Sequence, residues 1–339
     1  MAMLIWGGRV RVVSSHNGED NLFNLMCKDI RSGKLPYRLH ETTFTNALDD
    51  GLYDRVALTM GARLKEKTRE EWEAKVRAQY GEDAAEELDC IPKAGSGVYI
   101  PRAVIERAQS AGIPTIRYTK APGYELDDKR LAETDLWIAE VLKPIVDNLA
   151  NLRTVLGQDF GRSGDLSVAV PLQEYAKAQW RAAFQLELRG IPFDVQSRII
   201  GWLLDNLPLF HHAKFDARGN GQAHAEGLLQ RFGPARVECV MASPSWYAAN
   251  FPPYKAALED RSVEVAYGED VIADHRRVIL KNGYPAMDDG RDKGADGKPR
   301  HGDSAIAYVL AWAATRQEGQ PPAGASIDAV APVAGSWIR

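Results

Sequence analysis

The stretch VLGQDFGRSGDLSVAV, residues 155–170, predicts two apolar strands joined by a tight turn, with an aspartate where the first strand ends. Asp159 stands at the end of the expected strand 153–160, the turn runs from Gly161 to Gly164, and a second apolar strand departs over 165–173. A buried carboxylate is costly unless it is paired or binds a metal. The rest of the chain must therefore supply a partner or a cation for Asp159.

Two further aspartates occupy comparable positions later in an α/β order of elements. Asp216 ends a short strand and is followed by glycines, and Asp303 begins a helix whose apolar side chains cover one face. The strands that end on Asp159 and Asp216 can lie side by side in one sheet, and a late helix crossing that edge would add Asp303. Glycines beside each aspartate let another backbone approach closely.

Three neighbouring carboxylates repel one another and favour bound cations. Two of them about 4 Å apart repel by roughly 4 kcal/mol at an effective dielectric constant near 20. Oxygen-only ligands select hard ions such as Mg²⁺ or Mn²⁺, and two such ions can promote hydrolysis of a phosphodiester. The pattern predicts Asp159, Asp216 and Asp303 as the catalytic and metal-binding residues of a two-metal nuclease.

Each aspartate also has an ordinary structural explanation. An aspartate between a strand and a glycine is commonly a turn residue, and an aspartate at a helix start is commonly an N-cap. Taken singly, none of the three positions indicates chemistry. Only the three together, in this order of strands and helices, favour a nuclease.

Composition sets wider limits on the class of protein. The chain has 339 residues, of which 45% are hydrophobic and 26% charged, as in soluble globular proteins with room for two domains. The net charge of −4 gives no overall basic footprint, although a local basic groove would be enough for DNA. Three widely spaced cysteines indicate neither disulfides nor zinc, and no apolar run reaches the length needed to span a membrane.

Residues 152–316 resemble the nuclease domain of tailed-phage large terminase subunits, which has an RNase H-like fold, a mixed sheet flanked by helices. Three stretches are similar to that family's acidic motifs, in order: GQDFGRSGDLSVAV (157–170), KFDARGNGQAHAEGLLQRFG (214–233) and HGDSAIAYVLAWA (301–313). Residues 4–100 resemble the distal part of the same family's ATPase domain in its Mu-like branch, through GGRVRVVSSHNG (7–18) and AAEELDCIP (84–92).

This resemblance implies a Mg²⁺- or Mn²⁺-dependent endonuclease of phage DNA packaging that acts on double-stranded DNA in the cytoplasm of a bacterial host. It implies the small terminase subunit and the portal protein as partners. Two alternatives stay open: a non-catalytic prophage remnant that serves as an assembly or binding module, and an RNase H-like nuclease outside packaging.

The phosphate-binding loop of the family's ATPase domain, G-x-x-x-x-G-K-[ST], is not found in the sequence. RSGKLP (31–36) has a Gly-Lys pair but neither the earlier glycine nor the following Ser or Thr. We therefore expect no ATP-binding residues and no ATPase activity from this chain, which looks like a terminase that has lost its N-terminal portion.

Accessory candidates lie around the three motifs. Four residues could assist the metal site or only close turns and solvate loops: Asp165, Asp270, Asp274 and His301. The stretch before Asp303 is locally basic, and its candidates for contact with DNA phosphates are Arg276, Arg277, Lys293, Lys298 and Arg300. The alternative for these is a solvated loop. Glu187 is expected at the surface, since strand alternation places Leu186 and Leu188 on the opposite face.

The domain organisation predicted from these patterns has three parts. Residues 1–150 form the incomplete ATPase-like segment and linker, with a boundary near 145–151; residues 151–316 form the RNase H-like domain; and residues 317–339, rich in Pro, Gly and Ala, form a disordered tail. Strands are expected at 4–15, 37–44 and 180–189, and a helix over 130–149.

Overall fold

The computed structural model describes residues 11–16, 18, 22–60, 68–93, 97–161, 166–219, 221–281, 283–288, 292–294 and 297–317. It divides into two compact units, Met1–Pro101 with Val278–Ala286, and Arg102–Arg277 with Met287–Arg339. None of the described helices is long and apolar enough to cross a membrane. The tail expected at 317–339 lies outside the described residues, apart from Gln317.

The first unit is built mainly from helices. They are α2 (Leu22–Arg31), α3 (Phe44–Asp49), α4 (Leu52–Met60), α6 (Arg69–Tyr80) and α7 (Ala84–Glu87), joined by most of the hairpin β10 (Val278–Lys281) and β11 (Tyr284–Met287). The strand predicted at 37–44 does not form; Thr43 instead caps α3, because its hydroxyl accepts a hydrogen bond from the Asn46 N–H. Residues 11–16 form no strand either, and residues 4–10 lie outside the described part.

The second unit contains a mixed sheet in the order β1-β9-β5-β4-β3-β7-β8, with β6 pairing β4 and β2. Its strands are β1 (Gln109–Ser110), β2 (Thr115–Thr119), β3 (Thr154–Asp159), β4 (Leu166–Ala176), β5 (Gln179–Ala182), β6 (Gln185–Arg189), β7 (Phe210–Asp216), β8 (Val237–Val240) and β9 (Val263–Ala266). β3 runs antiparallel to β4 and parallel to β7. The predicted α/β class, a mixed sheet flanked by helices, is confirmed.

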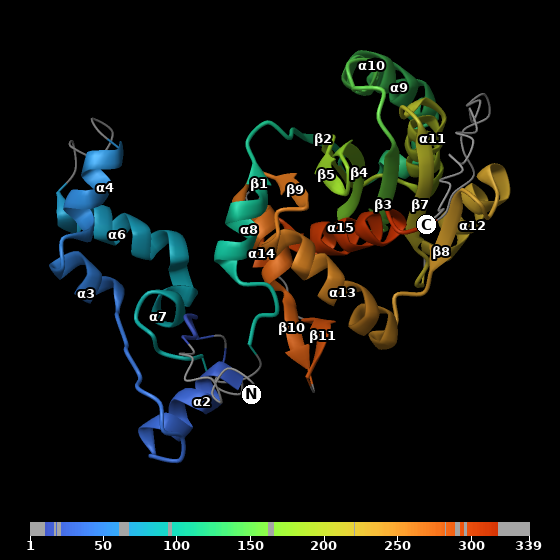
Figure 1. Cartoon of the computed structure of the whole chain (residues 1–339). Coiled ribbons are helices and arrows are strands. Elements are labelled where there is room, and N and C mark those ends of the chain that lie inside the picture. The colour runs from blue at the N-terminus through green and yellow to red at the C-terminus, as the bar shows by residue number, and fades with distance from the viewer. Residues whose placement is uncertain are drawn as a thin grey trace, which may run out of the picture. The chain divides into compact units, whose positions relative to one another are not determined.

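Helices cover both faces of this sheet (Figure 1). One apolar core joins the sheet to α9 (Arg130–Trp137), α10 (Lys143–Asp147), α11 (Phe193–Asn206) and α12 (Gly221–Phe232). The other face holds α15 (Asp303–Ala314), packed against α13 (Pro244–Glu259) and α14 (Glu269–Arg276), while α8 (Arg102–Ala108) packs on α13 and α14. A helix that is apolar all round must be buried, and α15 is buried along nearly its whole length.

Two sequence expectations differ from the observed sheet. The predicted strand 180–189 is broken at Ala183 and Phe184 into β5 and β6, which pair with different halves of the long strand β4. The unit that contains the sheet begins at Arg102 rather than near 145–151, because β2 pairs with β6 and α9 and α10 pack onto the sheet. The helix predicted over 130–149 forms as α9 and α10, joined through a π-helical turn at Ile138–Leu142.

Gly157 on β3 fixes how closely α15 approaches the sheet. A Cβ atom at this position would overlap the backbone nitrogen of Ala311 and the carbonyl oxygen of Ala307, both on α15. Backbone atoms cannot yield as the end of a flexible side chain can. The glycine two residues before Asp159 therefore allows the helix that begins with Asp303 to lie directly on β3.

We expect Gly157→Ala to lower the free energy of unfolding by about 1–3 kcal/mol, because the added methyl group forces α15 off the sheet. Gly227→Ala is the matched control, since Gly227 lies in α12 with open space around its would-be Cβ. That substitution should stabilise the protein by about 0.5–1 kcal/mol through helix propensity. Urea denaturation measures both, and an unfolding free energy in Gly157→Ala that is unchanged or raised, as in Gly227→Ala, would contradict the close approach.

Candidate metal centre

The sheet and α15 bring Asp159, Asp216 and Asp303 to one edge of the second unit. In the parallel pair β3–β7, Gln158 lies opposite Phe215, so the next residues, Asp159 and Asp216, end neighbouring strands, which lie about 4.8 Å apart. Asp303 is the first residue of α15, which packs across β3, β4 and β7 (Figure 1). All three carboxylates are buried, with 8%, 7% and 5% of the residue surface exposed.

Burial and neighbouring charges raise the proton affinity of Asp159 and Asp303. Burial raises the pKa of Asp159 well above its usual range, and the charges of Asp303 and Asp216 raise it further, while Arg218 opposes the shift. Burial and the nearby charge of Asp274 raise the pKa of Asp303 to about 7. Without a cation, Asp159 and Asp303 therefore bind protons that isolated aspartates release near pH 4.

The donor chemistry of this cluster suits a hard divalent cation, since it offers buried carboxylate oxygens that repel one another. In the part of the chain that the structure describes, however, no three His, Cys, Asp or Glu side chains are already arranged to hold a metal. Both carboxylate oxygens of Asp216 accept hydrogen bonds from Arg218, and Asp303 Oδ2 accepts one from the His301 N–H at 3.0 Å. A metal ion could bind the Asp216 oxygens only after their hydrogen bonds with Arg218 are broken.

A buried chain of hydrogen bonds fixes the end of β3 beneath Asp159. The Ser197 hydroxyl lies 2.9 Å from His224 Nδ1, and His224 Nε2 lies 3.0 Å from Gln158 Oε1. Because Gln158 Oε1 can only accept, His224 carries its proton on Nε2 and accepts at Nδ1. Gln158 Nε2 donates to the Ser167 hydroxyl, which donates to the backbone oxygen of Asp159 at 2.9 Å. The chain therefore holds β3 and β4 together at the site.

We expect this buried histidine to make the protein sensitive to acid. Burial lowers the pKa of His224 to about 4, whereas the unfolded chain binds the same proton near pH 6.5. Acid therefore favours the unfolded chain, and the stability present above pH 6.5 falls by about 3 kcal/mol as the pH is lowered through 4.

His224→Gln should flatten this part of the pH profile of unfolding free energy between pH 6.5 and 4, measured by urea titration. The part due to His275, whose pKa burial also lowers to about 4, should remain in the variant. An unchanged profile in His224→Gln would show that His224 does not contribute.

Asp274 of α14 caps the helix that carries Asp303. The N-cap residue of α15 is Gly302, with a left-handed φ of 86° and no side chain to satisfy the first backbone N–H groups. Asp274 Oδ2 instead accepts from the Ser304 N–H at 3.1 Å and from the Ser304 hydroxyl at 2.7 Å. A carboxylate from a distant element thus fixes the start of α15.

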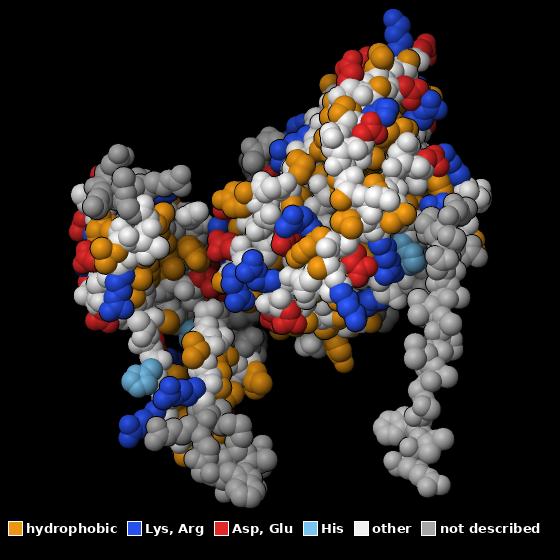
Figure 2. Space-filling view, turned by 45° about the horizontal axis from the view of Figure 1, so that its top comes forward, with side chains coloured by type: hydrophobic (Ala, Val, Ile, Leu, Met, Phe, Trp, Pro, Cys, Tyr) orange, Lys and Arg blue, Asp and Glu red, His pale blue; other side chains and the backbone are white. Residues whose placement is uncertain are grey.

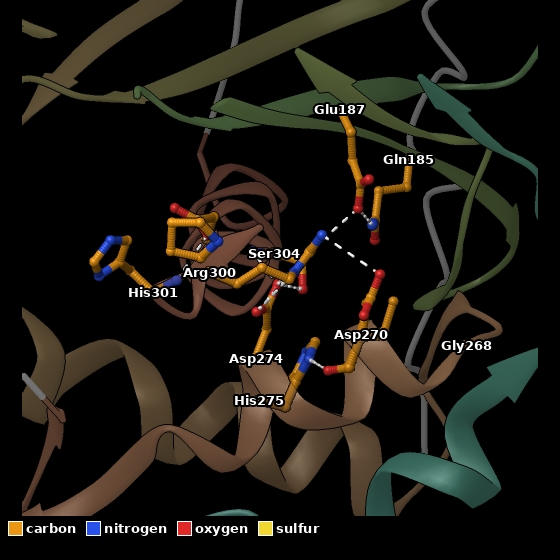
Figure 3. Close-up of polar contacts among 12 residues, drawn as sticks. Gln185, Glu187, Gly268, Asp270, Asp274, His275, Arg300, His301 and Ser304 are labelled. Atoms are coloured by element: carbon orange, nitrogen blue, oxygen red, sulfur yellow. Dashed lines mark hydrogen bonds and ion pairs between the residues drawn. The ribbon is translucent and has the colours of Figure 1, made fainter. Parts of the chain in front are cut away.

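Arg300 connects this cap to the sheet (Figure 3). Its guanidinium bonds to Asp274 Oδ2 at 2.7 Å and to Glu187 Oε1 of β6 at 3.1 Å, and lies 3.7 Å from Asp270 Oδ2. Glu187 also accepts from Arg117 Nε of β2 at 2.9 Å. With these partners, the side chains of Arg300, Asp274 and Glu187 are 3%, 1% and 5% exposed. The network of Arg300 ties α14, β6 and the start of α15 into one support for Asp303.

This network corrects several expectations for the loop before Asp303. Arg300 is buried and paired with carboxylates, and Arg277 is buried and bonded to Asp288 at 2.7 Å, so neither side chain is available to DNA phosphates. Asp274 caps α15 through Ser304, and its charge also lies close enough to raise the pKa of Asp303. Glu187 is buried rather than solvated.

The other accessory candidates lie in different environments. Lys298 is exposed and Arg276 half-buried, while Asp270 lies beside Arg300 and His301 precedes the cap of α15. Asp165 and the side chain of Lys293 lie outside the described residues. On the face shown in Figure 2, Lys and Arg side chains are interspersed with acidic and hydrophobic ones rather than gathered in one field.

With the fold and the acidic cluster in place, comparison with known proteins shows that the chain is similar to Mu-like phage terminase large subunits. It is 35% identical over 324 residues to the Mu-like prophage FluMu protein gp28 of Haemophilus influenzae, covering 94% of this chain and 64% of that protein. It is also 35% identical over 326 residues to "Probable terminase, large subunit gp28" of Escherichia phage Mu, covering 94% and 59%. The chain thus spans about three fifths of the length of these relatives.

Solved structures resemble the chain more loosely. The large terminase of bacteriophage HK97 gives a TM-score of 0.39 at 10% identity, over 87% of this chain and 61% of that one. The large terminase nuclease of thermophilic phage G20c with bound magnesium gives 0.37 at 20% identity, over 49% and 82%. No model of a protein family matches the chain.

Proposed function

We propose that this chain is a divalent-metal-dependent endodeoxyribonuclease of phage DNA packaging, with Asp159, Asp216 and Asp303 as the residues that hold Mg²⁺ or Mn²⁺. The observation that carries the proposal is the convergence of three buried carboxylates from β3, β7 and α15. The similarity to terminase large subunits supports double-stranded DNA as the substrate, and the small terminase subunit and portal protein as partners, in the cytoplasm of the bacterial host.

Two parts of the structure hold the three aspartates in place. Asp159 and Asp216 come from a sheet edge held by the hydrogen-bond chain through His224, and Asp303 comes from a helix held by Asp274 and Arg300. Two bound divalent ions would supply charge neutralisation and Lewis acidity for attack of water on phosphorus, which breaks one P–O bond of the DNA backbone. Rigid supports matter because such chemistry depends on positions set to within a fraction of an ångström.

The first experiment is plasmid cleavage by the full chain. Supercoiled DNA should become nicked or linear in Mn²⁺ or Mg²⁺ and stay intact in EDTA, as seen on agarose gels. The melting temperature should also rise with metal, because a ligand that binds only the folded state stabilises it by mass action. Intact plasmid at every metal concentration would contradict the proposal.

A non-catalytic assembly module is the second candidate function. The observation in its favour is that Asp216 is engaged by Arg218 and that no set of three ligands is ready among the described side chains. This candidate predicts that metal neither supports cleavage nor shifts the melting temperature.

A further inference from the structure

Arg218 and Asp216 form an ion pair within the turn that ends β7. Arg218 Nη2 lies 2.9 Å from Asp216 Oδ2, and Arg218 Nε lies 3.2 Å from Oδ1 and 3.1 Å from Oδ2. The Arg218 backbone N–H adds a fourth hydrogen bond to Oδ1 at 3.0 Å. The guanidinium therefore covers both oxygens through which Asp216 could bind a cation.

The two partners differ in how free they are to move. The Asp216 side chain is 8% exposed, whereas that of Arg218 is 44% exposed. The guanidinium carbon also lies 5.4 Å from the ring centroid of Tyr247 on α13, in range for a cation–π contact. Tyr247 is itself buried at 4% exposure. Arg218 can thus leave Asp216 towards solvent and still keep a second partner.

We propose that Arg218 is a resident counter-cation that occupies Asp216 in the metal-free protein and has to release it before a divalent ion binds. This inference rests on the proposed metal site. A divalent ion and a guanidinium compete for the same two oxygens, and their like charges repel. Once released, the guanidinium lies beside the site on the Tyr247 ring, where its planar fork matches a phosphate of the substrate.

Removing Arg218 should tighten metal binding rather than weaken it. Breaking a partly exposed ion pair is worth up to about 1 kcal/mol, so Arg218→Gln should lower the dissociation constant for Mn²⁺ on the order of 3- to 5-fold. Arg218→Lys keeps the charge but loses the bidentate fork, so its affinity should lie between those of the native chain and the Gln variant.

Isothermal titration of the full chain with MnCl₂ tests this, with Arg198→Gln as the control. Arg198 is a similarly exposed arginine, at 52%, which forms a bidentate ion pair with Asp135 away from the cluster. Its replacement should leave Mn²⁺ affinity unchanged. Melting curves in EDTA check that each variant is folded. If Arg218→Gln does not fold, the Mn²⁺ affinity of Arg218→Lys still tests the proposal.

The outcomes separate this inference from the function on which it rests. A resident counter-cation is supported if Mn²⁺ binds most tightly to Arg218→Gln, less tightly to Arg218→Lys and least tightly to the native chain. Saturable binding in the native chain with unchanged or weaker binding in Arg218→Gln overturns the inference and leaves the metal site standing. No saturable binding in the native chain overturns both.

Discussion

Asp159→Asn should abolish cleavage of plasmid DNA while leaving the fold intact. Asparagine keeps the shape of the side chain but removes one negative ligand from the cluster. Losing several kcal/mol of charge stabilisation in the transition state corresponds to a fall in rate on the order of 10³-fold. The rate of nicking in Mn²⁺, followed on gels, measures the effect.

The metal-free Asp159→Asn protein should be at least as stable as the native one. Asp159 is a buried carboxylate surrounded by Asp303 and Asp216, and burial and their charges already raise its pKa. Neutralising it relieves repulsion, so the melting temperature in EDTA should not fall. Asp205→Asn is the control, since Asp205 is an exposed residue at the end of α11, paired with Arg231. Equal losses of activity in both variants would show that acidic residues act on structure in general.

Arg300→Met should cost about 3–5 kcal/mol of unfolding free energy, the largest loss of stability that we expect from a single substitution here. The variant would leave the carboxylates of Asp274 and Glu187 buried without their shared counter-charge. Urea denaturation in EDTA measures the loss without any contribution from metal.

Arg181→Met provides the comparison for this prediction. Arg181 pairs with Glu264 at 2.6 Å between β5 and β9, but its side chain is 50% exposed. Solvent screens such a pair, so its loss should cost less than about 1 kcal/mol. A similar small cost at Arg300 would mean that water or protonation of the carboxylates replaces the missing charge.

The sequence predicted the parts of the site that depend on local pattern. Strands that end on an aspartate and then turn through glycine identified the neighbouring ends of β3 and β7, and the apolar run after Asp303 identified α15. These features depend on periodicity and turn chemistry within short segments. The neighbouring strand ends and the late helix were therefore predictable without a structure.

The support for Asp303 was not predictable, because it depends on contacts between distant segments. Alternation along β6 correctly placed Glu187 opposite Leu186 and Leu188, but both faces of this sheet are covered, so the opposite face is not solvent. In the sequence, Arg300 is one of several basic residues in a loop. Only the fold brings Asp274 and Glu187 beside it. The break between β5 and β6 could not be predicted for a similar reason, since the residues of a strand segment carry no information on which strands it pairs with.

The place of α15 at the end of the described chain has a consequence for synthesis on the ribosome. β3 and β7 emerge first, with Asp159 and Asp216, while the helix that covers them and carries Asp303 is still untranslated. At about 5–20 residues per second, on the order of 10 s separates the synthesis of residue 159 from that of residue 303. During that interval the nascent polypeptide holds two of the three carboxylates and a bare apolar sheet face, so the proposed DNA-cutting centre is completed only after the segment that begins with Asp303 has been translated.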